Sequence, residues 1–443
     1  MNMQSSSSST HALASMRRSP TTGVLWSRKD IGEMFEGCLS PLGRSFTEYY
    51  RSEVHPLSVR RMGLRYGGEP HEYYRIERGY VYANVAYFEH LFSQSPAGRN
   101  LGKFVRAFAS GEVDVRQYQN PYGAHPDADH VRTFACWMAW QGCTLARVAR
   151  ASRSQPNLDA ARARVRELQA RQVGDARLHS EVEQALGRFR EAYADYFPVV
   201  LNAFVLQSAL LALYRARGGA DINAIEAWSR DRLDARAAER AALAVLAACL
   251  ATRPAWVASL TSGASHSMSA NDPTVVGIRE ECEVFLREYG ASGTVEMDLA
   301  RSRYEDDPRL VRAAVLRAWS APQSSAPISL SEALCGAHLA VADLASVLAL
   351  ARLLEWHERA RVGLRKKVVN AIWEVRALLA EAARRFGLRG QLRQQHDFAN
   401  VTLHELLDGL MGKPFGAPAR FESRRLRYLA ECEIDAPATS FIA

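Results

Sequence analysis

Glu296 and Asp298 stand two positions apart, and apolar residues alternate with them. On an extended backbone this spacing would point both carboxylates to one side. Two such carboxylates can act as general acid and base, or can bind a metal ion. The pair can equally be structural, capping a neighbouring helix and forming ion pairs with Arg301 and Arg303. We favour the structural interpretation.

A helix is expected to lead into this pair. Apolar residues recur at three- and four-residue steps between 275 and 286, which is the spacing that places them on one helical face. The helix should end at Tyr289, because Gly290 follows and glycine is common just past a helix end. The carboxylates would then lie in an irregular turn after the helix.

The stretch from Phe285 to Pro308 reads FLREYGASGTVEMDLARSRYEDDP. It resembles the FLxRYGHRGPGEIDLARPRWxEDP signature of the substrate-binding domain of rifampicin phosphotransferases, which are relatives of phosphoenolpyruvate synthase. Further stretches resemble the family in the same order, and the resemblance covers residues 23 to 440. These stretches are Trp26 to Leu42, Gly79 to Asn84, Asp397 to Leu407 and Arg424 to Tyr428.

The resemblance implies a division of labour among domains. In the family, an ATP-grasp domain phosphorylates a histidine on a swivelling domain, and that histidine carries the phosphoryl group to a substrate on the helical domain. This chain resembles the helical domain alone. We therefore expect it to act with separate ATP-grasp and phosphohistidine proteins, which would bind ATP and Mg²⁺. The chain itself is expected to bind no cofactor or metal and to be inactive alone.

The segment EWHERARVGLRKK resembles the start of the family's RExxK helix. On that alignment His357 replaces the Arg, Glu358 matches the Glu and Arg361 replaces the Lys, so these three are the expected catalytic residues. Arg365 continues the same helical face. Positioned positive charge is what phosphoryl transfer chiefly needs. The alternative is a solvated helix face with acidic ion-pair partners.

The substrate-binding residues are expected in the matching segments. They are Trp26, Arg28, Pro41, Tyr82, Tyr289, Glu296, Asp298 and Arg365. The largest departure from the signature is Ala291-Ser292, which replaces a His-Arg pair. This loss favours a protein that binds a ligand without transferring a group to it.

Two histidine-containing loops have other possible roles. The segment Ser262 to Ser267 resembles the phosphohistidine motif GGxxSHA but lacks its first glycine, and we interpret it as a chance match in a loop. His125 and His130, with two intervening aspartates, have a spacing that could bind a metal ion. No third strong ligand is evident there, so a surface loop is the favoured interpretation.

Composition excludes some classes of function. The 443 residues are 48% hydrophobic and 23% charged, with a net charge of +8. The arginines are spread along the chain among acidic residues, which argues against nucleic-acid binding. No signal peptide is evident, and no CxxC pair occurs, so a cytoplasmic protein is expected. The uncharged stretch Tyr196 to Tyr214 is long enough to span a membrane, but its polar residues favour a buried core helix.

The predicted fold is all-α, with a short extended segment near residue 82. Residues 1–22 are expected to be a disordered Ser-rich tail, and residues 23–443 a helical substrate-binding domain of one or two lobes. The expected function is a stand-alone substrate-binding component of a phosphoenolpyruvate-synthase-like system, holding a small hydrophobic molecule for phosphorylation or condensation. The alternative is a non-catalytic binder of an antibiotic or natural product, or a scaffold protein.

Overall fold

The computed structural model confirms a mainly helical protein. Its description covers residues 21–28, 31–35, 37–64, 73–94, 118–122, 144–146, 149, 158–171, 173–217, 219, 222–232, 236–251, 273–320, 328–335, 339–393, 395–434 and 440–442. The His125–His130 loop and the Ser262–Ser267 loop lie outside these residues.

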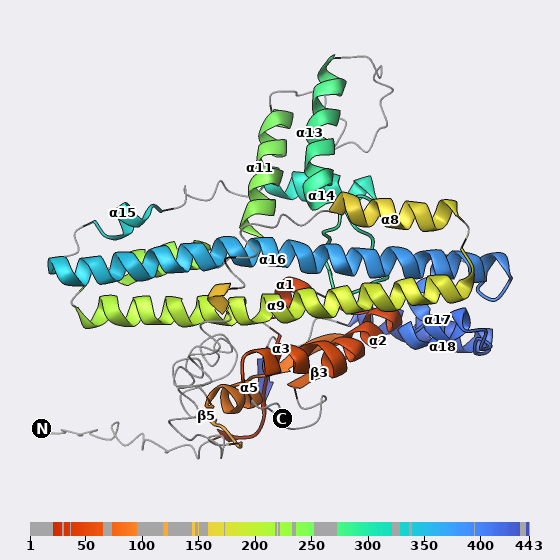
Figure 1. The fold of residues 1–443 in the computed structure, drawn as a ribbon, viewed down its shortest axis with the longest axis horizontal. Helices are drawn as coiled ribbons and strands as arrows, with labels where there is room; N and C mark the ends of the chain where they lie inside the picture. The colour runs from red at the N-terminus through yellow and green to blue at the C-terminus, as the bar shows by residue number, and fades with distance from the viewer. Residues whose placement is uncertain are drawn as a thin grey trace, which may run out of the picture.

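Two long antiparallel helices form the centre of the molecule (Figure 1). They are α9 (Asp175–Ala216) and α16 (Val341–Leu388), and they pack against each other along most of their length. Helix α16 continues without a break past Gly363. A single interior glycine costs a helix only about 1 kcal/mol, which burial against α9 offsets.

The uncharged stretch Tyr196–Tyr214 is part of α9. Among the described helices, α9 alone is long and apolar enough to cross a membrane, with a mean hydropathy of 1.8 in its most apolar window. However, 56% of that window is buried inside the protein. Leu206, Leu210 and Tyr214 belong to a hydrophobic cluster. Helix α9 shares this cluster with α16, α10 (Ile222–Arg232) and α15 (Leu330–Ala333). This burial supports the core-helix interpretation.

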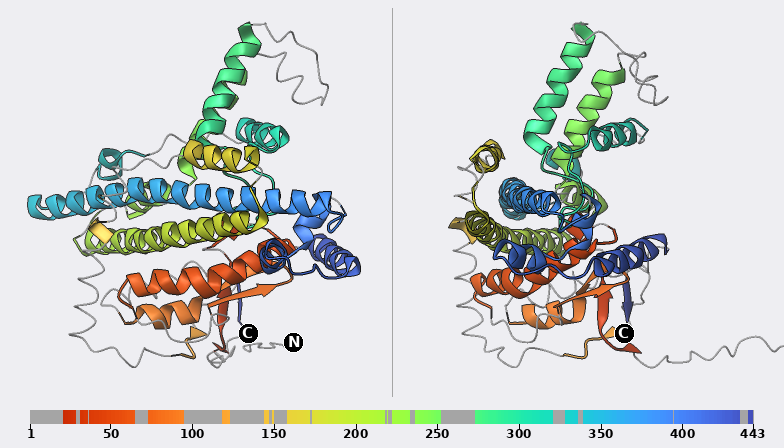
Figure 2. Two further views of the ribbon diagram at one scale, coloured as in Figure 1. Left: turned by 45° about the vertical axis from the view of Figure 1, so that its right-hand side comes forward. Right: turned by 90° about the vertical axis from the view of Figure 1, so that its right-hand side faces the viewer.

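A small sheet and a helical segment lie on one side of the central pair (Figures 1 and 2). The antiparallel sheet has the order β3-β4-β2-β6. The predicted extended segment near residue 82 is confirmed as β4, which runs directly into α5, and the Asn84 side chain caps that helix. The pairing of β6 with β2 was not predicted. The bounds are β2 (Leu25–Ser27), β3 (Tyr74–Glu77), β4 (Tyr80–Asn84), α5 (Val85–Phe92) and β6 (Ser440–Ile442).

Three further helices pack together on the opposite side of the central pair (Figure 2). They are α11 (Ala237–Ala251), α13 (Pro273–Tyr289) and α14 (Pro308–Ser320), with their own hydrophobic cluster. Helix α13 ends at Tyr289, as predicted. Residues 290–307 connect α13 to α14, and we call this connection the signature turn because it holds the stretch that resembles the family signature. The signature turn lies between this three-helix group and α16.

The remaining elements surround this frame. They are β1 (Thr21–Thr22), α1 (Gly32–Phe35), α2 (Pro41–Tyr49), a π-helix (Tyr50–Val54), α3 (His55–Arg61), β5 (Tyr118–Gln119), α8 (Leu158–Ala170), α10 (Ile222–Arg232), α15 (Leu330–Ala333), a 3₁₀ helix (Gln395–Asn400), α17 (Leu403–Leu410) and α18 (Pro418–Glu433). The last two residues of the predicted tail thus form β1.

Candidate functional site

A small depression with a mixed polar and apolar lining lies where the three-helix group meets the middle of α16. Its cavity volume is about 10 Å³, close to the space that one water molecule needs, and it is partly open to solvent. Its walls come from the start of α11, the end of α13, the turn that follows and one face of α16. The lining residues are Ala238, Glu239, Glu288, Tyr289, Ala291, Ser292, Val362, Arg365, Lys366, Val369 and Asn370.

The signature turn is held rigidly beside this depression. The fully buried Arg303 guanidinium donates hydrogen bonds to the backbone carbonyls of Val295, Glu296 and Asp298, at 3.0, 2.6 and 3.3 Å. Burial lowers the pKa of Arg303 to about 10, so this side chain still carries its charge at neutral pH. The backbone N–H of Tyr304 also donates to the Ser292 carbonyl at 3.0 Å. Arg303 therefore organises the turn's backbone, whereas the sequence had paired it with the acidic side chains.

Glu296 forms an ion pair beneath the depression. Its Oε1 lies 2.5 Å from an Arg365 nitrogen and 3.7 Å from an Arg236 nitrogen. The Glu296 side chain is almost entirely buried, and so is that of Arg365. This pair joins the signature turn to α16 and supplies fixed charges at the wall of the depression.

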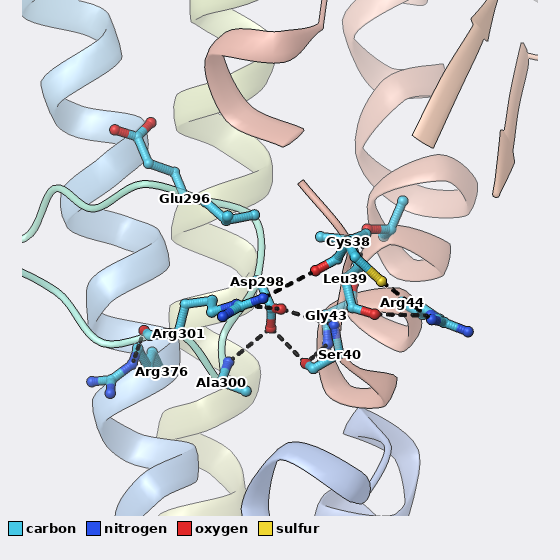
Figure 3. Close-up of polar contacts among 12 residues, drawn as sticks. Cys38, Leu39, Ser40, Gly43, Arg44, Glu296, Asp298, Ala300, Arg301 and Arg376 are labelled. Carbon is cyan, nitrogen blue, oxygen red and sulfur yellow. Dashed lines mark hydrogen bonds and ion pairs between the residues drawn. The ribbon is translucent and has the colours of Figure 1, made fainter. Parts of the chain in front are cut away.

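Asp298 has a different role, because it binds Ser40, the N-cap residue of α2 (Figure 3). Its carboxylate accepts hydrogen bonds from the Ser40 backbone N–H at 2.8 Å and the Ser40 hydroxyl at 2.6 Å. Gly43 is needed here, because a β-carbon on it would lie 2.7 Å from the Asp298 carboxylate. Pro41 begins α2 beside this contact. The capping that the structural interpretation expected is therefore observed for Asp298.

The two carboxylates do not point the same way, so that prediction was wrong. Residues 291–300 form successive turns in place of an extended strand. Glu296 therefore faces α16, whereas Asp298 faces the start of α2 (Figure 3).

His357, Glu358 and Arg361 are buried within the core. His357 Nδ1 lies 2.9 Å from the Leu353 carbonyl, so it donates to that oxygen, and His357 Nε2 accepts from the Asn202 amide of α9 at 2.7 Å. Burial lowers the pKa of His357, so the ring is neutral at pH 7. Arg361 Nε lies 3.0 Å from the Glu358 carboxylate. The alternative of a solvated helix face was therefore wrong for these residues.

The other predicted binding residues lie away from the depression, on the sheet side of the central pair. Trp26 and Tyr82 are buried in β2 and β4. The Arg28 guanidinium stacks over the Tyr80 ring, 4.9 Å from its centre. Of the predicted site residues, Tyr289 and Arg365 line the depression, and Glu296 lies next to it through its ion pair with Arg365. Trp26, Arg28, Pro41 and Tyr82 are not among its lining residues.

Glu239, Tyr304 and Lys366 belong to this region but were missed in the sequence. The Tyr304 hydroxyl donates to Glu239 Oε1 at 3.0 Å. Lys366 forms an ion pair with Glu288, and its Nζ lies 5.0 Å from the centre of the Tyr289 ring. The position of Lys366, next to Arg365, was a usable signal. Glu239 had none, because it is a single acidic residue near the start of an Ala-rich helix and belongs to no recognisable motif.

Among the described residues, no three His, Cys, Asp or Glu side chains gather as the ligands of a metal ion would. The five described cysteines, Cys38, Cys249, Cys282, Cys335 and Cys432, carry free thiols. The charges at the depression therefore come from side chains: Arg236, Arg365 and Lys366 against Glu239, Glu288 and Glu296.

These features define a mainly helical protein with a small depression, lined by both charged and apolar side chains, between two groups of helices. No protein-family model matches the chain. Among curated proteins, it is similar to the prodigiosin synthesizing transferase PigC of Serratia marcescens, with 28% identity over 302 residues. The match covers 64% of this chain and 33% of PigC, so the chain corresponds to about a third of that relative's length.

Proposed function

We propose that this chain is the substrate-binding component of a transferase system in natural-product biosynthesis, related to phosphoenolpyruvate synthase. It holds a small hydrophobic molecule while ATP-grasp and phosphohistidine partner proteins phosphorylate or condense it. ATP and Mg²⁺ act on those partners, and the chain works in the cytoplasm without nucleic acid or membrane. The similarity to a transferase that synthesises prodigiosin supports the natural-product assignment.

The observation that carries this proposal is the position of the depression. It is lined by the turn that resembles the family signature and by α16, the helix that holds the RExxK-like segment. Two segments nearly 70 residues apart, joined by the Glu296–Arg365 ion pair, thus converge on one small space. Arg365 and Lys366 place positive charge there, as an incoming phosphoryl group requires.

In this proposal, His357, Glu358 and Arg361 are positioning residues. They are buried one and two turns before Arg365 on α16, and the His357–Asn202 hydrogen bond fixes α16 against α9. Arg365 and Lys366 then face the substrate, with the Tyr289 ring as an apolar wall.

A non-catalytic binder is the second candidate, and one observation favours it. Ala291 and Ser292 line the depression at the positions where the family signature has a His-Arg pair. If that pair contacts the transferred group in relatives, the depression here keeps the binding surface without the contact. A self-resistance protein that sequesters a natural product would need only such a binding surface.

Label transfer separates the two candidates. The purified chain is incubated with γ-labelled ATP, Mg²⁺ and a small-molecule extract of the host, with and without purified ATP-grasp and phosphohistidine proteins. We expect label on a small molecule only in the full mixture. Lys366→Gln should lower the transfer about tenfold or more, whereas Lys413→Gln, a change of the same type on an exposed lysine, should not. Absence of label on every small molecule would favour the binder.

A further inference from the structure

Glu239 has a buried carboxylate oxygen without a hydrogen bond. Its Oε1 accepts from the Tyr304 hydroxyl, but its Oε2 has no hydrogen-bond partner. The residue is only 4% exposed and lines the depression. Buried polar atoms are nearly always paired, and an unpaired one costs roughly as much as the hydrogen bond it lacks. Such an atom at a site is therefore suited to a ligand.

The charges around Glu239 make this oxygen stand out. Glu296 lies beside Arg236 and Arg365, and Glu288 pairs with Lys366, so those two carboxylates already have cationic neighbours within ion-pair distance. Burial, together with the neighbouring Glu296 charge, raises the pKa of Glu239, while Arg236 and Arg365 oppose that shift. A hydrogen-bond donor placed at Oε2 would relieve the cost of burying it.

We propose that Glu239 recognises the ligand of the depression by accepting a hydrogen bond from an N–H or O–H group on it. The terminal torsion of a glutamate is soft, so the carboxylate can turn to present either oxygen. The Tyr289 ring, Val362 and Val369 supply apolar contacts beside it. The ligand class is thus an aromatic or aliphatic molecule with an amine or hydroxyl group. This inference rests on the proposed function, since it gives the depression a substrate.

Three related probes test the proposal: benzylamine, benzyl alcohol and benzyl methyl ether. The ether keeps the ring and loses the donor. Binding to the whole chain is measured by ligand-observed NMR at millimolar concentration. We expect benzylamine or benzyl alcohol to bind about tenfold more tightly than the ether, because a hydrogen bond to a charged group has about this effect. The probe with the larger increase in affinity over the ether shows whether the site prefers an amine or a hydroxyl group.

Glu239→Gln should remove this preference, whereas Glu283→Gln should keep it. The second variant makes the same charge change on the exposed face of α13. The Tyr304 hydroxyl can still donate to the amide oxygen of Glu239→Gln, so this variant should fold, and its thermal unfolding midpoint verifies that it does. Failure of both donors to bind, equal binding of all three probes, or unchanged binding by Glu239→Gln would overturn the proposal.

The pH dependence gives a second readout. Protonation removes the negative charge and makes the carboxyl a weaker acceptor, so benzylamine binding should weaken as the pH falls through the raised pKa of Glu239. The groups facing it are Arg236 just before α11, Arg365 on α16, and Glu296 and Tyr304 between α13 and α14. Since Glu239→Gln keeps these groups, it should lose the pH dependence if Glu239 is responsible, and retention of that dependence counts against the proposal.

Label transfer and probe binding can fail separately. Glu239-dependent binding without label transfer would contradict the phosphotransfer role and leave the recognition role intact. Transfer that persists with unchanged probe binding in Glu239→Gln would contradict the recognition role alone.

Discussion

At the scale of single residues, neighbours decide what identical chemical groups do. Glu296 and Asp298 are both fully buried carboxylates, two positions apart. Glu296 pairs with arginines and supplies charge at the depression, whereas Asp298 caps α2 through Ser40. Replacing Asp298 should therefore mainly lower the stability of the fold, whereas replacing Glu296 should change the charges at the depression.

Asp298→Ala should therefore destabilise the protein by about 3 kcal/mol. It removes hydrogen bonds from a charged group to Ser40 and leaves a buried backbone N–H without its acceptor. Urea unfolding followed by circular dichroism measures the change. Asp408→Ala, at a half-exposed aspartate on α17, is the control and should change stability by less than about 0.5 kcal/mol. A loss below about 1 kcal/mol for Asp298→Ala would contradict the capping role.

His55 should make stability depend on pH. Its ring is enclosed by Tyr73, Tyr74, Phe88 and Phe197, with ring centres 5.2 to 5.5 Å away. Burial lowers the pKa of His55 from 6.5 to about 3. Below pH 6.5 the unfolded chain binds a proton that the folded chain does not, so this contribution to stability is lost as the pH falls from about 6.5 toward 3.

His55→Phe should remove the contribution of His55 to the loss of stability at low pH. Between pH 7.5 and pH 5 the difference amounts to about 2 kcal/mol, at roughly 1.4 kcal/mol per pH unit below 6.5. Urea unfolding at the two pH values gives the number. The control replaces the exposed His404 by Phe. If His55→Phe shows the same pH dependence as the unchanged protein, then His55 accepts a proton without unfolding.

At the scale of elements, the α9–α16 pair determines which predicted residues reach the depression. The 3.6-residue period placed His357, Arg361 and Arg365 on one face of α16. It could not show that α9 covers the first part of this face, because the Asn202–His357 contact joins residues 155 positions apart. Local patterns did predict the end of α13, which depends on the glycine that follows it, and the extended segment that forms β4.

A double-mutant cycle on Asn202 and His357 tests this contact between helices. Each single change to Ala should cost about 2 to 4 kcal/mol, because it creates a cavity and removes one partner of a buried hydrogen bond. The double variant should cost about 1 kcal/mol less than the sum of the two, since the partner is then already gone. Unfolding in urea supplies all four free energies, with Ser346→Ala on the exposed face of α16 as control. Additive costs would mean that the hydrogen bond contributes nothing.

The site itself was only partly predictable from the sequence. Tyr289, Glu296 and Arg365 lie in segments with a recognisable pattern, and the structure brings them together. Glu239 could not be found, because its role depends on how α11 is placed over the signature turn. Trp26 and Tyr82 were predicted as site residues because they lie in segments that resemble the family. Resemblance of two segments to one family does not mean that both line the same pocket.

At the scale of the whole molecule, segments near the two ends of the described chain pair in one sheet. Strand β6 (Ser440–Ile442) pairs with β2 (Leu25–Ser27), and α18 contributes an ion pair from Glu431 to Arg44 of α2. Strand β2 thus lies between β4 and β6. Alternation of apolar residues could not predict this pairing, since β6 is three residues long and more than 400 residues from its partner.

Deleting residues 435–443 should therefore weaken the fold and expose an edge. The deletion removes β6, whose three residue pairs with β2 contribute about 2 to 3 kcal/mol at roughly 1 kcal/mol per backbone hydrogen bond. It also leaves β2 as an unprotected edge strand, which favours pairing between chains. We expect a lower thermal unfolding midpoint and a concentration-dependent oligomer on size-exclusion chromatography. Deleting residues 1–18, which lie within the predicted Ser-rich tail of residues 1–22, is the control and should change neither property. An unchanged midpoint and a monomeric product from the first deletion would mean that β6 contributes little to stability. The signature turn and the α9–α16 pair would then hold the fold without the β2–β6 pairing.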